Sequence, residues 1–172
     1  MVGWVTVGVY LIAAGAAAAM AARGWFPDRT ALRERAFWSL AAVLLVLLGI
    51  NKQLDLQSFL TAVGRCDALA QGWYEDRRAI QRMFILVAIG VGAAGLLATG
   101  LLLRETLART GIALLGLGFV TIFVVTRAAS FHHMDALINT WIGGVRINWV
   151  LELFGPLLVI AAALRGFAPS RT

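Results

Sequence analysis

Charged residues are scarce in this chain. Only 14% of its 172 residues are Asp, Glu, Lys or Arg, whereas 60% are hydrophobic. Soluble domains average about 25% charged and about 45–50% apolar residues. The scarcity excludes a disordered tail and an ordinary soluble enzyme. The net charge of +6 does not indicate a nucleic-acid partner either, because the basic residues lie beside long apolar runs, as in a protein held in a bilayer.

Cysteine and lysine are almost absent. The single cysteine, Cys66, excludes an internal disulfide and a metal site built from cysteines alone. The single lysine, Lys52, stands against 14 arginines, a composition typical of GC-rich bacterial genomes. We therefore expect a multi-pass protein of the bacterial inner (cytoplasmic) membrane.

Long apolar stretches recur along the chain. A hydrocarbon core about 30 Å thick needs about 20 helical residues to cross it. The pattern predicts an all-α integral membrane bundle, a single domain over residues 1–172 with five transmembrane helices. Five spans place the termini on opposite sides, and arginines in two connections, 23–36 and 104–110, favour an outside N-terminus and a cytoplasmic C-terminus. The helices are expected at about 2–22, 36–57, 83–103, 111–139 and 146–165.

Three of these helices run out of apolar residues before they cross. Their apolar runs cover 36–50, 111–126 and 153–164, and their polar ends all fall on one side of the membrane. Charges at membrane depth cost about 2.5–3.5 kcal/mol each, so they should face one another and not lipid. This predicts a polar crater in the outer leaflet, facing the periplasm or exterior. Its members are Asn51, Lys52, Asp55, Arg127, Ser130, His132, His133, Asp135, Asn139, Arg146, Asn148 and Glu152.

The histidines favour two kinds of chemistry. His132 and Asp135, three residues apart on a helix, can supply two ligands to zinc or another transition metal, with Glu152, Asp55 or His133 as further ligands. Without a metal, His132 oriented by Asp135 can act as a general base, with Ser130 as nucleophile or Glu152 as acid. In a third interpretation both histidines lie among the lipid headgroups and form local hydrogen bonds.

The basic residues of the crater have two interpretations as well. Lys52, Arg127 and Arg146 can bind an anionic headgroup or phosphate, with Asn51, Asn139 and Asn148 as polar neighbours. They can instead form ion pairs that lock the bundle, Lys52 with Asp55, Arg127 with Asp135 and Arg146 with Glu152.

Other features concern packing. Trp73 and Tyr74 are typical of interfacial anchors, or of a lid over a ligand. Small residues four apart predict close helix approaches within the chain or a homodimer face. These pairs are Gly15 with Ala19, Ala88 with Gly92, and Gly95 with Thr99.

One stretch resembles a known family. Arg127-Ala-Ala-Ser130, followed by Asp135, Asn139 and Gly143, is similar to the RxxS…DxxxN…G signature of VanZ-like small membrane proteins. Asn51-Lys52 is similar to an Asp-Lys dipeptide of that family. This sequence departs in the Ser-to-Asp interval, which His132 and His133 make two residues longer. The resemblance covers about 20 residues and implies a bacterial envelope protein of a family associated with glycopeptide tolerance, without supplying a reaction.

These patterns together predict a membrane protein that acts on a lipid or lipid-linked anionic substrate at the outer leaflet, as a hydrolase or transferase that can be metal-dependent. The alternative is a non-catalytic accessory or ligand-binding subunit. The apolar inner halves of the spans argue against a transporter.

Overall fold

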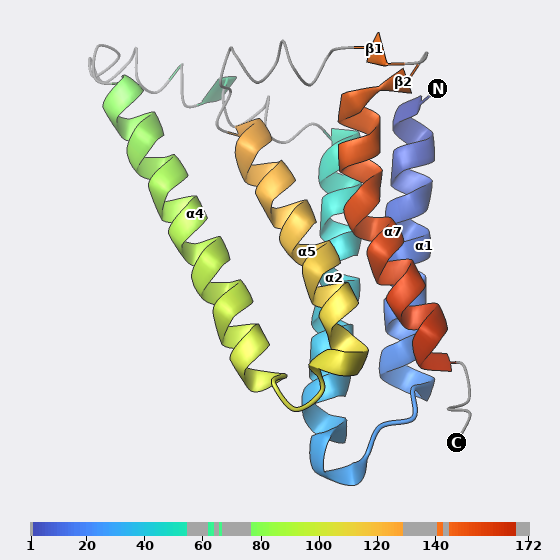
Figure 1. The fold of residues 1–172 in the computed structure, drawn as a ribbon. Helices are drawn as coiled ribbons and strands as arrows, with labels where there is room; N and C mark the ends of the chain where they lie inside the picture. Colours follow the sequence, from blue (N-terminus) through green and yellow to red (C-terminus); the bar gives the residue numbers. More distant parts are fainter. Residues whose placement is uncertain are drawn as a thin grey trace.

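Helices dominate the structure, a computed structural model that describes residues 2–54, 62, 63, 66, 77–128, 141, 142 and 145–167 (Figure 1). Two short strands pair antiparallel just before the last helix, with Trp141 opposite Arg146. The expected all-α bundle is confirmed. The described elements are α1 (Val2–Arg23), α2 (Asp28–Leu54), α4 (Arg77–Leu102), α5 (Leu107–Ala128), β1 (Trp141–Ile142), β2 (Val145–Arg146) and α7 (Ile147–Phe167).

The described helices run up and down in turn, so the bundle has two ends (Figure 1). We call one the Lys52 end: α2 and α5 end there, and α1, α4 and α7 begin there. We call the other the Arg109 end: α1, α4 and α7 end there, and α2 and α5 begin there. The start of α1 and the end of α7 lie at opposite ends, as an odd number of crossings requires.

The helices have the length and composition of membrane spans. Four of them contain a sufficiently long apolar stretch, namely Gly3–Arg23, Ile85–Leu102, Leu107–Val125 and Trp149–Phe167. Large apolar side chains are exposed along their outer faces, and Trp4 and Trp25 are exposed near the two ends of α1, as interfacial tryptophans are. The chain is therefore a multi-pass membrane protein. The crossing by α2 is a prediction that its antiparallel packing along α1 supports.

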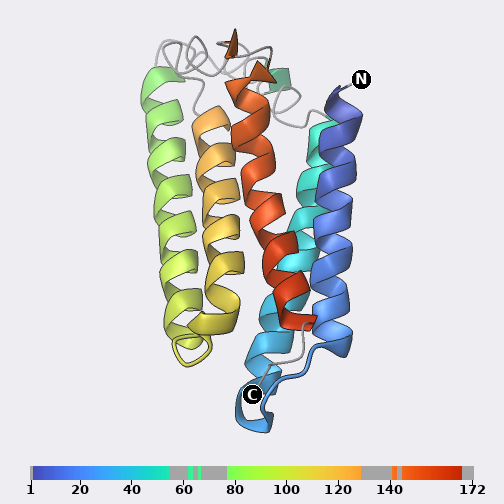
Figure 2. The ribbon, with the colours of Figure 1, turned by 45° about the vertical axis from the view of Figure 1, so that its right-hand side comes forward.

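The core lies between α1, α2, α5 and α7. Alanines at positions 13, 14 and 17 of α1 are buried against α2, where Trp38, Ala41 and Leu45 are almost fully enclosed. Figure 2 shows α7 between α5 and α1, and its Val159 is fully buried. Small side chains let the backbones approach closely, which supplies the packing that holds helices together in lipid.

Three helices begin earlier than the apolar runs predict. α2 begins at Asp28 and not at 36, α4 begins at Arg77 and not at 83, and α5 begins at Leu107 and not at 111. Pro27 precedes α2 and its carbonyl accepts the backbone N–H of Thr30 and Ala31 at 2.9 Å, while Asp28 suits the positive end of the helix dipole. Hydropathy marks where a helix enters the apolar core, whereas caps decide where it starts.

A close approach of α5 and α7 involves two glycines that are not among the predicted small-residue pairs. A Cβ added at Gly116 of α5 would lie 2.7 Å from the Gly155 carbonyl oxygen of α7, and one added at Gly155 would lie 2.7 Å from the Gly116 carbonyl oxygen. Of the predicted small pairs, Gly92 meets Thr121 of α5, whereas Gly15 and Gly95 face open space. Helix α7 continues through Pro156, next to this crossing.

Candidate functional site

The ends of α2 and α5 and the start of α7 lie at the same end of the bundle, the Lys52 end (Figure 1). Asn51 and Lys52 lie in the last turn of α2, and both are half-buried. Glu152 lies in the second turn of α7 and is buried. Three further residues are placed at this end by their backbone alone: Arg127 in the last turn of α5, Arg146 in β2 and Asn148 in the first turn of α7.

The remaining predicted site residues lie outside the described residues. They include both histidines, so metal ligation and acid–base chemistry stay predictions. Within the described ranges, no group of three or more His, Cys, Asp or Glu side chains is placed to hold a metal ion. The residues outside are Asp55, Ser130, His132, His133, Asp135 and Asn139, together with Trp73 and Tyr74.

An ion pair joins Lys52 to Glu152 across 100 positions of the sequence. The Lys52 Nζ lies 2.7 Å from the Glu152 Oε1 and 2.9 Å from its Oε2. The carboxylate is only 5% exposed, whereas the lysine side chain is 27% exposed. A buried carboxylate needs a charged or hydrogen-bonding partner, and Lys52 meets that need while part of its own side chain stays exposed.

Helix α1 contributes a polar residue that the sequence analysis missed. Tyr10 is buried and lies against α2, because a Cβ built on Gly49 would be 3.4 Å from the Tyr10 Cβ. Its hydroxyl interacts electrostatically with Glu152. The described side chains of the site thus come from α1, α2 and α7. The first span reads as apolar throughout, but Thr6, Tyr10, Ala13 and Ala17 repeat at helical spacing and are all buried, which is the signal that marks an inward face.

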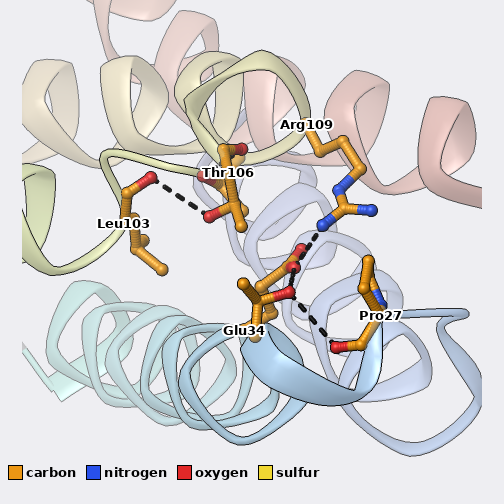
Figure 3. A network of polar contacts seen from close by, with 7 residues as sticks. Pro27, Glu34, Leu103, Thr106 and Arg109 are labelled. Carbon is orange, nitrogen blue, oxygen red and sulfur yellow. Dashed lines mark hydrogen bonds and ion pairs between the residues drawn. The ribbon is translucent and has the colours of Figure 1, made fainter.

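A second buried charge lies at the Arg109 end, and the sequence analysis did not predict it (Figure 3). Glu34 of α2 is fully buried, and its Oε1 accepts hydrogen bonds from the Thr30 Oγ1 at 2.9 Å and from the Arg109 Nη2 at 2.5 Å. The Arg109 side chain is 44% exposed. The pair ties α5 to α2 at the point where both helices begin, opposite the Lys52 end.

Two buried polar atoms beside this pair have no hydrogen-bond partner among the described residues. They are the Glu34 Oε2 and the Trp38 Nε1, one helical turn apart on α2. Thr106, in the turn before α5, and Thr110 of α5 are also buried, and their hydroxyls donate to the carbonyls of Leu103 and Thr106 at 3.1 and 3.0 Å, respectively. The Glu34 carboxylate is therefore held by one oxygen.

The end of α1 is fixed by a basic residue of α2. The Arg35 Nη1 donates to the carbonyl oxygens of Ala21 and Ala22 at 2.8 and 3.2 Å, and its guanidinium lies 5.7 Å from the centre of the Phe26 ring. A cation at a helix C-terminus satisfies free carbonyls and complements the helix dipole. Arg35 thus has a structural role at the Arg109 end.

No protein-family model, characterised protein or solved structure matches this chain. The resemblance of residues 127–143 to VanZ-like proteins therefore stays a prediction from the sequence, and the site has to be interpreted from its own chemistry.

Proposed function

We propose that this chain is a protein of the bacterial cytoplasmic membrane that binds the anionic group of a lipid or lipid-linked substrate at its Lys52 end, on the outer side. The observation that carries the proposal is the Lys52–Glu152 pair, in which the glutamate side chain is buried and the lysine side chain is partly exposed. Such a pair at the end of a membrane bundle holds an ammonium group in a fixed orientation where lipid headgroups lie.

The hydrogen-bonding capacity of Lys52 supports binding of an anion. An ammonium group has three N–H donors. One of them donates to the Glu152 Oε2 at 2.9 Å, and no side chain other than Glu152 accepts a hydrogen bond from Lys52 among the described residues, so donors remain for a ligand oxygen. Glu152 orients these donors, and the backbone positions of Arg127 and Arg146 place two more cations at the same end.

Ligand binding can be measured with a simple amphiphile. Dodecyl phosphate carries the proposed anionic group on an alkyl chain, and dodecyl maltoside serves as the uncharged background detergent. We expect saturable calorimetric binding of dodecyl phosphate that weakens at least tenfold in Lys52→Gln, because a hydrogen bond to a charged group contributes about 1.5–3 kcal/mol.

A charge-swapped variant separates binding from a structural lock between α2 and α7. Lys52→Glu with Glu152→Lys preserves an ion pair but moves the ammonium to the buried position. We expect it to remain folded and to bind dodecyl phosphate as weakly as Lys52→Gln. Swapped protein that binds like the wild type would show that the pair only locks the helices.

Turnover distinguishes the enzyme from the accessory subunit. We propose hydrolysis or transfer at the bound anionic group, with His132 and Asp135 at the reacting centre and zinc as the candidate metal. A long-chain phosphodiester should yield product with the wild type and none with His132→Ala, and elemental analysis should detect about one metal ion per chain. Binding without product from the wild type would favour the accessory subunit.

A further inference from the structure

An apolar groove of about 230 Å³ runs between α2, α4 and α5. Helix α4 packs mainly against α5, and almost none of its apolar stretch is buried (Figure 1). The glycines of α4 that line the groove have no side chains, so no side chain of α4 fills the space at these positions. Among the residues that line the groove are Phe37, Leu44, Gly92, Gly95, Leu117 and Thr121.

The groove offers nothing to a polar ligand. Its lining contains two hydroxyls, and both are bonded within their own helices. The Thr99 Oγ1 donates to the Gly95 carbonyl at 2.7 Å, and the Thr121 Oγ1 donates to the Leu117 carbonyl at 2.8 Å. The remaining lining is hydrocarbon, so the occupant is hydrocarbon as well.

Lipid is the apolar component that surrounds a multi-pass protein, and its acyl chains are hydrocarbon along their whole length. An acyl chain therefore matches the lining of the groove. A helix of a second copy, about 10–12 Å wide, is the alternative occupant that the test below separates from it.

The Arg109 end of the groove is basic. Arg33 lies on the face of α2 that lines the groove: at 100° per residue it is within about 40° of Phe37, Leu40 and Leu44. Side chains on a helix lean toward its N-terminus, and the N-terminus of α2 is at the Arg109 end. Arg104 is exposed in the turn that joins α4 to α5. Neither arginine has a carboxylate partner within the described ranges, and this end carries seven arginines against Asp28, Glu34 and Glu105.

We propose that the groove binds one acyl chain of an anionic glycerophospholipid, whose phosphate is held by Arg33 and Arg104. The binding site is separate from the Lys52–Glu152 pair and lies toward the opposite leaflet. The acyl chain contacts both α4 and α2, and it fills the space between them that the side chains of the protein leave open.

The test measures lipid retained by purified protein in detergent, counted by native mass spectrometry. The probes are phosphatidylglycerol and phosphatidylcholine with identical acyl chains. We expect one phosphatidylglycerol per chain, preferred at least tenfold over phosphatidylcholine, and equally so in Lys52→Gln, which separates this site from the proposed function.

Two glycines of α4 provide a matched pair of variants. A Cβ has open space at Gly95 in the groove and at Gly90 outside it. Gly95→Leu fills the groove and should lower retention at least tenfold, whereas Gly90→Leu should leave it unchanged. Arg33→Gln with Arg104→Gln should bring the preference between the two lipids to about one.

Three results would overturn the proposal. Equal retention by Gly95→Leu and Gly90→Leu would show that the groove holds no lipid, and a wild type without preference would remove the headgroup contact. A dimer that dissociates in Gly95→Leu would assign the surface to a second copy of the chain.

Discussion

The two partners of the Glu34–Arg109 pair differ in burial, and this difference sets the cost of losing either one. Glu34 is fully enclosed, whereas the Arg109 side chain is 44% exposed. A buried charge that loses its partner has no access to water, while a half-exposed guanidinium can turn toward solvent or headgroups. Removal of the arginine is therefore the more damaging change.

We expect Arg109→Gln to lower the free energy of unfolding by about 2–4 kcal/mol, less than a fully buried pair because solvent screens the arginine. Glu34→Gln keeps the Thr30 hydrogen bond and should cost about 1 kcal/mol or less. Thermal unfolding in detergent measures both. The double variant should recover most of the loss, and a double variant as unstable as Arg109→Gln would contradict the burial argument.

Glu34 shows why one charged residue escaped prediction. It stands between Arg33 and Arg35, in a stretch that reads as a basic membrane anchor. Its helical spacing from Trp38 and Ala41 marks it as inward-facing, and this signal is present in the sequence. Lys52 and Glu152 were placed at one end correctly, but their pairing depends on the relative rotation of α2 and α7, which no local pattern specifies.

At the scale of elements, the glycine crossing holds α5 against α7. The backbones of Gly116 and Gly155 approach so closely that neither position has room for a Cβ. This contact fixes α7, and with it Glu152, relative to the neighbouring helices. A search for small residues four positions apart in one helix does not find this contact, because the two glycines belong to different helices.

Gly116→Ala should lower stability by about 1–3 kcal/mol, because the added methyl forces the two helices apart. Gly111→Ala is the control: it lies on the same helix with open space around its Cβ, and alanine favours helix there. Apparent melting temperatures in detergent compare the two. Equal stability of both variants would mean that α5 and α7 can separate without loss.

The existence of the helices was predictable, whereas the starts of α2, α4 and α5 were not. The long apolar runs of α1 and α7 gave ranges within two residues of the structure at each end. α2 and α4 begin eight and six residues earlier than predicted, at Asp28 and Arg77, because their first turns are polar. Hydropathy does not register polar turns that lie beyond the apolar core of the membrane.

Because the described helices alternate in direction, the side of the membrane on which one helix end lies determines the sides of all the others. Cys66, the chain's one cysteine, is exposed and lies between the end of α2 and the start of α4, both at the Lys52 end. The proposed orientation places this end outside.

A membrane-impermeant maleimide should therefore label Cys66 in intact cells, and Cys66→Ser should remove the labelling. In that background, Ala108→Cys introduces an exposed thiol at the Arg109 end. It should react only after the membrane is permeabilised. Labelling of Ala108→Cys in intact cells, with Cys66 protected, would invert the orientation and move the proposed substrate site to the cytoplasmic side.

The two ion pairs also define a distance along the axis of α2. Glu34 and Lys52 are 18 residues apart on α2, which corresponds to about 27 Å along the helix axis. An average hydrocarbon core is about 30 Å thick, so a bilayer that matches these anchors is slightly thinner than average. Hydrophobic mismatch then becomes a property of this molecule: we expect thicker membranes to thin around it, and in a membrane of uneven thickness we expect it to gather where the hydrocarbon core is about 27 Å thick.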